Sequence, residues 1–128
     1  MLKKLTPVLI VTAIEPVLPF WQSLGFSQTA AVPQGDKLGF VILQRDDIEV
    51  MYQTVASVKE DAARVLEGKL QPGAAMLYFH VDDLEDIMRR IPRGSDVIVE
   101  RRKTFYGALE TIVRDPAGHI LTFAQMMS

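Results

Sequence analysis

The sequence carries the same order of predicted elements twice, and this repetition restricts the fold more than any other feature. Residues 5–54 have the pattern of a strand, a helix and three further strands, and residues 74–128 have the same pattern. Arg-Asp opens the last turn of both copies, and a glutamine closes the strand after each of these turns. Because each copy of an internal repeat forms one supersecondary unit, two copies indicate paired modules and not a long solenoid. We therefore predict an α+β fold built from two βαβββ modules.

The first copy begins with "PVLIVTA" at residues 7–13, where β-branched residues favour a strand. Pro16 suits the first turn of the following helix, because the N–H that proline lacks would have no partner there. Trp21 has helical spacing with its apolar neighbours and is predicted to lie in the core, and Gly25 has the place of a C-cap. Three further strands are predicted at residues 26–33, 37–45 and 48–54.

A polar helix at residues 57–68 is predicted to connect the two copies. Ser57 and Glu60 have the S-x-x-E spacing of a capping box, in which each side chain satisfies a backbone donor at the N-terminus of the helix. The predicted organisation is a single domain over residues 1–128, with module one at about 5–56, the connector helix at 57–68 and module two at about 74–128.

The second copy begins with a predicted strand at residues 74–81. The helix that follows runs from Asp82 to Pro92, and Asp82 and Glu85 form a cap-like pair. The basic run "ERRK" at residues 100–103 is interpreted as a solvated strand edge, since charged side chains discourage pairing with another strand. The last three strands are predicted at residues 96–103, 109–115 and 119–125.

Composition excludes several classes of function. The net charge is -2 and the acidic and basic residues are interspersed, so no basic stripe is available for nucleic acid or for a membrane surface. No apolar run approaches the ~20 residues that span a bilayer. The chain has no cysteine, which excludes disulfides, thiolate nucleophiles and zinc-thiolate sites and agrees with a cytoplasmic protein. The opening "MLKKLTPVLIVTA" is interpreted as a first strand and not as a signal peptide.

Three segments carry a resemblance to a known family: "VTAIEPVLPFWQSLGF", "FHVDDLEDIMRRI" and "RDPAGHILTF", in this order. With the duplicated module they resemble the vicinal oxygen chelate superfamily, which includes glyoxalase I, extradiol dioxygenases and bleomycin-resistance proteins. The likeness covers essentially the whole chain and is closest to the bleomycin-resistance branch. It implies one glyoxalase-like domain whose open curved sheet forms a cup around a small-molecule ligand, and it implies a homodimer.

The resemblance also implies four cup-facing metal-ligand positions, which fall on Thr6, Glu49, Met76 and Thr122. Two hydroxyls and a thioether are poor ligands for a divalent ion that prefers imidazole or carboxylate. A single carboxylate does not hold such an ion with useful affinity. We therefore predict no metal and no other cofactor, and we do not expect a mechanism that uses a metal as a Lewis acid.

Two histidines remain to be interpreted. His80 shares strand parity with Met76, so it faces the cup if Met76 does. It then either forms a displaced metal site with Glu49 or makes a local hydrogen bond at the end of its strand. His119 belongs to the "DPAGH" turn and is predicted to be an exposed turn residue and not a ligand.

Strand alternation also separates a cup face from a face that packs under the helices. The cup face mixes apolar walls with a few polar groups, as a small-molecule pocket does, although such residues can also fill a core between modules or subunits. Phe105 and Tyr106, before Gly107, offer aromatic faces to a flat ligand or pack as a β-turn on the rim. The predicted ligand-binding residues are Glu49, Met51, Met76, Tyr78, His80, Phe105, Tyr106 and Thr122.

Glu49 allows three interpretations. A carboxylate on the cup face binds a cationic ligand or pairs with an arginine, faces water, or acts as a general base with a raised pKa. Overall we predict a metal-free protein that sequesters an aromatic or cationic small molecule. One alternative is a divalent-metal-dependent lyase, isomerase or dioxygenase with a site displaced to Glu49 and His80. The other is a structural or regulatory dimer module whose cup is filled by its own side chains.

Overall fold

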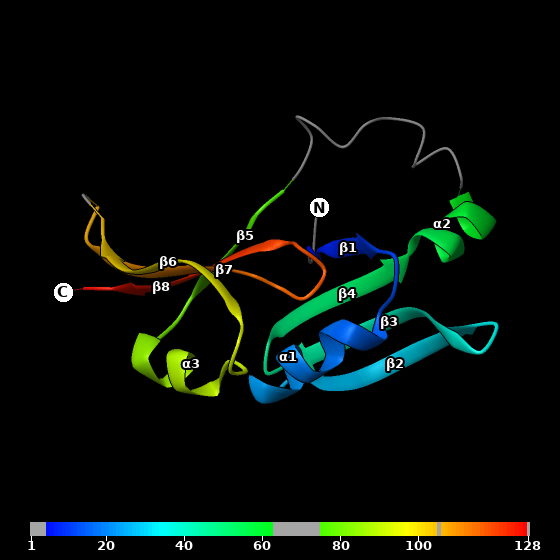
Figure 1. Cartoon of the computed structure of the whole chain (residues 1–128), viewed down its shortest axis with the longest axis horizontal. Coiled ribbons are helices and arrows are strands. Elements are labelled where there is room, and N and C mark those ends of the chain that lie inside the picture. Colours follow the sequence, from blue (N-terminus) through cyan, green and yellow to red (C-terminus); the bar gives the residue numbers. More distant parts are fainter. Residues whose placement is uncertain (1–4, 63–74, 105, 128) are drawn as a thin grey trace. The chain divides into compact units, whose positions relative to one another are not determined.

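The computed structural model describes residues 5–62, 75–104 and 106–127. The chain forms two compact units, unit 1 (Met1–Pro72) and unit 2 (Gly73–Ser128). Each unit carries one open four-stranded sheet with helices (Figure 1). The predicted α+β fold with two modules is therefore confirmed.

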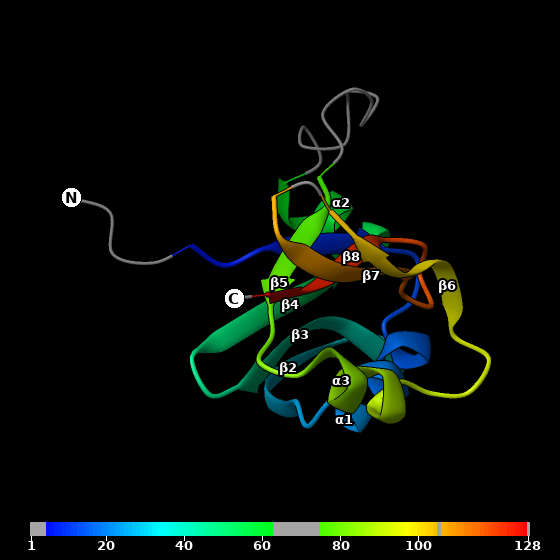
Figure 2. The ribbon, with the colours of Figure 1, turned by 90° about the vertical axis from the view of Figure 1, so that its left-hand side faces the viewer.

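In unit 1 the sheet has the strand order β1-β4-β3-β2. Strands β1 and β4 pair in parallel, and the other neighbours pair antiparallel. Figures 1 and 2 show β4, β3 and β2 side by side from two directions. The elements are β1 (Val8–Val11), η1 (Glu15–Val17), α1 (Leu18–Ser23), β2 (Ser27–Gln34), β3 (Lys37–Arg45), β4 (Ile48–Thr54) and α2 (Val55–Ala62).

Unit 2 repeats this topology. Its sheet has the order β5-β8-β7-β6, again with a parallel pair, β5 and β8, followed by antiparallel neighbours. The internal repeat read from the sequence is thus a repeat of pairing and not only of element order. The elements are β5 (Leu77–His80), α3 (Leu84–Arg90), β6 (Asp96–Lys103), β7 (Ala108–Arg114) and β8 (Ile120–Met126).

Trp21 lies at the centre of the unit 1 core, as the sequence predicted. Its side chain is fully buried, and its indole Nε1 donates a hydrogen bond of 2.8 Å to the hydroxyl of Tyr52. Phe20 and Phe26 meet the indole ring edge to face, with ring centroids 5.6 and 4.8 Å away. The indole therefore joins α1 to β4 through one polar contact inside an apolar cluster.

The helix starts differ from the predicted ones by one or two residues. Helix α2 begins at Val55 because the hydroxyl of Thr54 accepts the backbone N–H of Ser57 at 3.1 Å, as an N-cap does. The predicted capping box of Ser57 and Glu60 is therefore wrong, and Glu60 instead accepts a hydrogen bond from Gln34. Residues 63–68 of the predicted connector helix lie outside the described residues.

Helix α3 is capped by Asp83, whose carboxylate accepts the backbone N–H of Asp86 at 3.3 Å. The predicted pair of Asp82 and Glu85 is thus wrong by one residue. The carboxylate of Glu85 instead binds both the Nε and an Nη of Arg101, at 2.6 and 3.0 Å. Among the described residues, no helix is long and apolar enough to cross a membrane.

The "DPAGH" turn before β8 is organised by a buried carboxylate. Asp115 accepts the backbone N–H groups of Ala117 and His119, and Gly118 supplies the left-handed conformation that the turn needs, with φ +94°. The imidazole of His119 lies 3.3 Å from the Asp115 carboxylate. His119 is therefore half-buried and held by the turn, which corrects the prediction of an exposed residue.

Candidate functional site

One face of the unit 2 sheet carries three of the polar and aromatic side chains predicted for a ligand site, Tyr78, His80 and Thr122. Tyr78 is the register partner of Thr122, and Ala124 is the partner of both His80 and Glu110. Residues directly opposite on neighbouring strands share a face, so these side chains project to the same side. We call the face that carries Tyr78, His80, Arg102, Glu110 and Thr122 the Glu110 face.

Glu110 is the centre of this face and was missed by the sequence analysis. Its side chain lies in β7 and is closed to solvent. Oε2 accepts hydrogen bonds from the hydroxyl of Tyr78, at 2.6 Å, and from the hydroxyl of Tyr106. Oε1 accepts from Nε and Nη2 of Arg102, at 3.1 and 2.9 Å. A carboxylate has about four acceptor positions, so Glu110 is fully satisfied.

The hydrogen bonds determine the ionisation states of Glu110 and Tyr78. Burial alone raises the pKa of Glu110, but the hydrogen bonds from Tyr106, Tyr78 and Arg102 together outweigh burial and lower the pKa of the carboxyl. Glu110 is therefore ionised at neutral pH. The hydrogen bond to Glu110, with burial, raises the pKa of Tyr78, so this residue remains a neutral phenol.

This arrangement predicts a pH-dependent stability. Because the pKa of Glu110 is lowered from its ordinary value of 4.5, the unfolded chain binds a proton there more readily than the folded one. The stabilisation is present above that ordinary value and is lost as the pH falls through the folded pKa. Urea unfolding of the wild type and of Glu110→Gln between about pH 3 and pH 7 measures it. We expect the difference in free energy of unfolding between the wild type and Glu110→Gln to shrink as the pH falls. A difference that stays constant with pH would contradict this account.

A bulge in the edge strand β6 places Arg102 against the carboxylate. Val99 pairs with Ile112 and Arg102 pairs with Glu110. Three steps along β6 therefore match only two steps along β7, so β6 holds one extra residue. Arg101 takes the left-handed conformation there, with φ +49°, and its N–H donates to the buried hydroxyl of Thr111 at 3.1 Å. The extra residue shifts the alternation of β6 and brings Arg102 to the Glu110 face.

The same bulge refines the interpretation of "ERRK" as a solvated strand edge. These side chains are exposed and β6 is an edge strand, as predicted. Three of the four nevertheless form ion pairs, since Arg102 pairs with Glu110 and Arg101 pairs with both Glu85 and Glu100. The only hint of Glu110 in the sequence is a carboxylate in the middle of the mostly apolar segment "ALETIV".

The aromatic rings around Glu110 are open to solvent although their hydroxyls are not free. Tyr78 and Tyr106 are each 45% exposed, and Met76, one residue before β5, is 73% exposed. His80 is exposed and meets the ring of Tyr78 edge to face, with the centroids 5.3 Å apart. The surface is thus made of aromatic rings and a thioether around the buried carboxylate of Glu110.

Two predicted site residues of unit 2 need separate mention. Thr122 is only 8% exposed, because β5 and β7 flank it, so it contributes little surface. Phe105 lies outside the described residues.

Unit 1 brings together two of the four positions at which the resemblance implies metal ligands. The hydroxyl of Thr6 donates a hydrogen bond of 3.0 Å to Oε1 of Glu49. Met51, two residues further along β4, is half-buried on the same side of the strand. Glu49 therefore has a polar partner inside its own unit. Its partnership with His80 of unit 2 stays a prediction.

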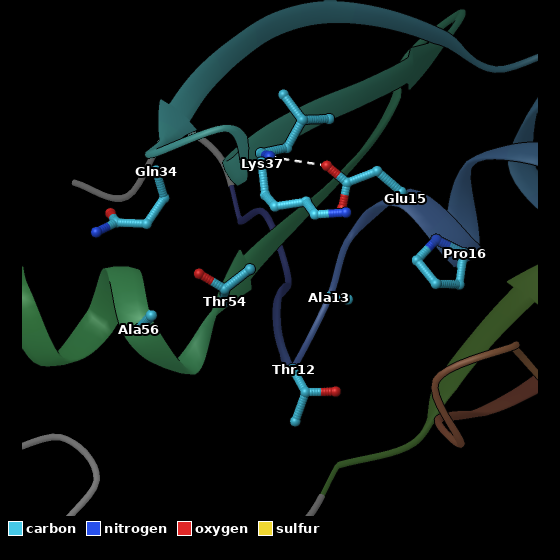
Figure 3. A pocket seen from close by; sticks show the side chains of 9 residues that line it. Thr12, Ala13, Glu15, Pro16, Gln34, Lys37, Thr54 and Ala56 are labelled. Carbon is cyan, nitrogen blue, oxygen red and sulfur yellow. Dashed lines mark hydrogen bonds between the residues drawn. The ribbon is translucent and has the colours of Figure 1, made fainter.

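Within residues 5–62, 75–104 and 106–127, no group of three or more histidine and carboxylate side chains is placed to hold a metal ion. Unit 1 does contain an open pocket of about 450 Å³ that the sequence did not predict (Figure 3). It lies between the loop after β1, the turn from β2 to β3 and the junction of β4 with α2.

Comparison with solved structures finds the same fold in several proteins. A glyoxalase-related enzyme from Fulvimarina pelagi has a TM-score of 0.75 and 20% identity, over 97% of this chain and 88% of that chain. A glyoxalase/bleomycin resistance protein/dioxygenase family enzyme from Burkholderia phytofirmans PsJN has a TM-score of 0.75 and 15% identity, over 95% and 97%. TioX from Micromonospora sp. ML1 has a TM-score of 0.72 and 16% identity, over 98% and 99%. At these identities the likeness shows the fold alone.

The sequence was also compared with curated proteins and with models of protein families. No curated protein matches the chain. The model of the glyoxalase/bleomycin resistance protein/dioxygenase superfamily matches residues 5–123, which is most of the chain. The chain therefore belongs to the glyoxalase/bleomycin resistance protein/dioxygenase superfamily.

Proposed function

We propose that this protein binds a small aromatic cation on the Glu110 face, without a metal, and sequesters it without breaking a bond. This places it in function near the bleomycin-resistance branch of its superfamily. The observation that carries the proposal is the double hydrogen bond from Tyr78 and Tyr106 to one buried carboxylate oxygen. A cytoplasmic location and a homodimer stay predictions.

The hydrogen-bond pattern selects the ligand. A phenol has one O–H, and both phenols use it on Glu110. The oxygen of Tyr78 can then only accept a hydrogen bond, so a polar group that binds it has to be a donor. An aromatic molecule with amino or protonated ring nitrogens meets this requirement and stacks on the exposed rings. A positive charge over the rings adds a cation–π attraction.

The same pattern argues for binding and against catalysis by Glu110. A general base needs a free lone pair and a pKa near the working pH. Glu110 has its acceptor positions filled and a lowered pKa. The carboxylate instead holds the two phenols in place, so the face is organised before a ligand arrives, which reduces the entropic cost of binding.

Proflavine, a cationic diaminoacridine, is a suitable probe, and 9-anthracenecarboxylate is its matched anionic control with a similar ring area. We expect proflavine to bind in a saturable way and the anthracene acid to bind at least about tenfold more weakly. Tyr78→Phe keeps the ring and removes the acceptor oxygen. It should weaken the binding of proflavine by about tenfold and leave the affinity for 9-anthracenecarboxylate unchanged. Isothermal titration calorimetry measures both.

Tyr78→Leu separates stacking from hydrogen bonding, because it removes the ring as well as the oxygen. It should weaken both ligands. Failure of both probes to saturate would reject an aromatic binding site. Equal affinities for the two probes, unchanged in Tyr78→Phe, would reject the role of the phenol oxygens.

A further inference from the structure

The open pocket of unit 1 shares no lining residue with the Glu110 face or with the positions that the resemblance implied. Its volume of about 450 Å³ lies within the range of about 300–1,000 Å³ that is common for small-molecule sites. All of its lining residues belong to unit 1. Figure 3 shows them on three segments that are far apart in the chain.

Two hydrogen bonds join these segments, and one close approach tightens the hairpin between β2 and β3. Oε2 of Glu15 in η1 accepts the backbone N–H of Leu38 in β3 at 2.8 Å, which ties the loop after β1 to the hairpin (Figure 3). Gln34 in β2 donates to Glu60 in α2 at 2.6 Å. A Cβ on Gly39 would lie 2.7 Å from the Cβ of Gln34, so only glycine permits this close approach within the hairpin. The pocket is therefore built before any ligand binds.

The pocket carries one group of each charge beside apolar walls. The hydrogen bond from Leu38 and, to a smaller extent, the nearby charge of Lys37 lower the pKa of Glu15, so its carboxyl is ionised. The carboxylate keeps acceptor positions beyond those used by the backbone, because it has about four. Among the described residues, the ammonium of Lys37 makes no ion pair. Apolar lining comes from Ala13, Pro16, Leu38 and Ala56.

We propose that the unit 1 pocket binds a small zwitterion, a free amino acid with a short apolar side chain. The ammonium of the ligand pairs with Glu15, its carboxylate pairs with Lys37, and its side chain lies against Ala13 and Leu38. A ligand with only one of the two charges leaves either the carboxylate or the ammonium of the pocket unpaired. Both charges of the ligand are therefore needed for full affinity.

Titration of the ¹⁵N-labelled full chain with L-leucine, followed by NMR, tests this site. We expect saturable shifts of the Leu38 amide, whose N–H is bonded to Glu15. N-acetyl-L-leucine lacks the ammonium and L-leucine amide lacks the carboxylate, and each should bind about tenfold more weakly. Shifts that do not saturate, or equal affinity for the three compounds, would overturn the proposal.

Two variants test whether Glu15 and Lys37 are the residues that pair with the charges of the ligand. Glu15→Gln keeps an acceptor for the Leu38 N–H and removes the charge, and Lys37→Gln removes the opposite charge. Each should weaken L-leucine by about tenfold, whereas Lys59→Gln, at an exposed lysine of α2, should not. Retained dispersion of the amide spectrum shows that each variant is folded. Unchanged affinity in Glu15→Gln and Lys37→Gln would place the binding elsewhere.

Discussion

Replacement of Glu110 with alanine is expected to lower the free energy of unfolding by about 2–4 kcal/mol and to abolish proflavine binding. The alanine removes the shared acceptor of Tyr78, Tyr106 and Arg102 and leaves a cavity beneath them. These three groups are each about half exposed and can be rehydrated, which keeps the loss below that of a fully buried pair. Urea unfolding monitored by circular dichroism measures the stability, and calorimetry measures the binding.

Glu110→Leu is the matched control for the cavity, since leucine fills most of the same space. It should cost less stability than Glu110→Ala, because leucine makes apolar contacts where alanine leaves a cavity, while the half-exposed Arg102 is hydrated in both variants. It should still abolish binding, because the phenols lose the acceptor that orients them. Retention of proflavine binding in Glu110→Leu would contradict the positioning role of Glu110.

Trp21→Ala is expected to lower the free energy of unfolding by about 3–5 kcal/mol. The indole is fully buried, touches the rings of Phe20 and Phe26 and donates to the hydroxyl of Tyr52. Its removal therefore leaves a large cavity and takes away the donor that bonds the Tyr52 hydroxyl. Urea unfolding followed by circular dichroism is the appropriate measurement, because the variant lacks the only tryptophan.

Tyr52→Phe separates the hydrogen bond from the packing at this position. It removes the hydroxyl that accepts from Trp21 and keeps the ring, so it should cost only about 1–2 kcal/mol. A loss in Tyr52→Phe as large as that in Trp21→Ala would show that polar contacts and not apolar packing dominate the unit 1 core.

Alternation and turn chemistry predicted much of the fold. Strand parity places Leu9 with Val11, and Val50 with Tyr52, on one face of the strands, and all four residues are buried. Such patterns are local, so they can be read from a single sequence. The helix starts were less well predicted, because cap-competent residues stand close together. Thr54 competes with Ser57, and Asp83 competes with Asp82, and tertiary packing selects between them.

The candidate site was predicted only in part. Strand parity placed Tyr78, His80 and Thr122 on one face, and the observed register agrees. Glu110 was missed because its significance depends on contacts between strands that are distant in the chain. The bulge at Arg101, which brings Arg102 to Glu110, depends on the buried hydroxyl of Thr111 in the neighbouring strand. The unit 1 pocket was missed for a similar reason, since three separate segments build it.

The most direct test of metal-free ligand binding is the affinity of the wild-type protein for proflavine, measured with excess EDTA and again with manganese, zinc, nickel or iron(II). If the Tyr78 and Tyr106 rings and their oxygens bind the ligand, the dissociation constant is the same in all of these conditions. Binding that disappears in EDTA and returns with one of the metals would contradict the proposed function. It would instead favour a divalent-metal-dependent lyase, isomerase or dioxygenase.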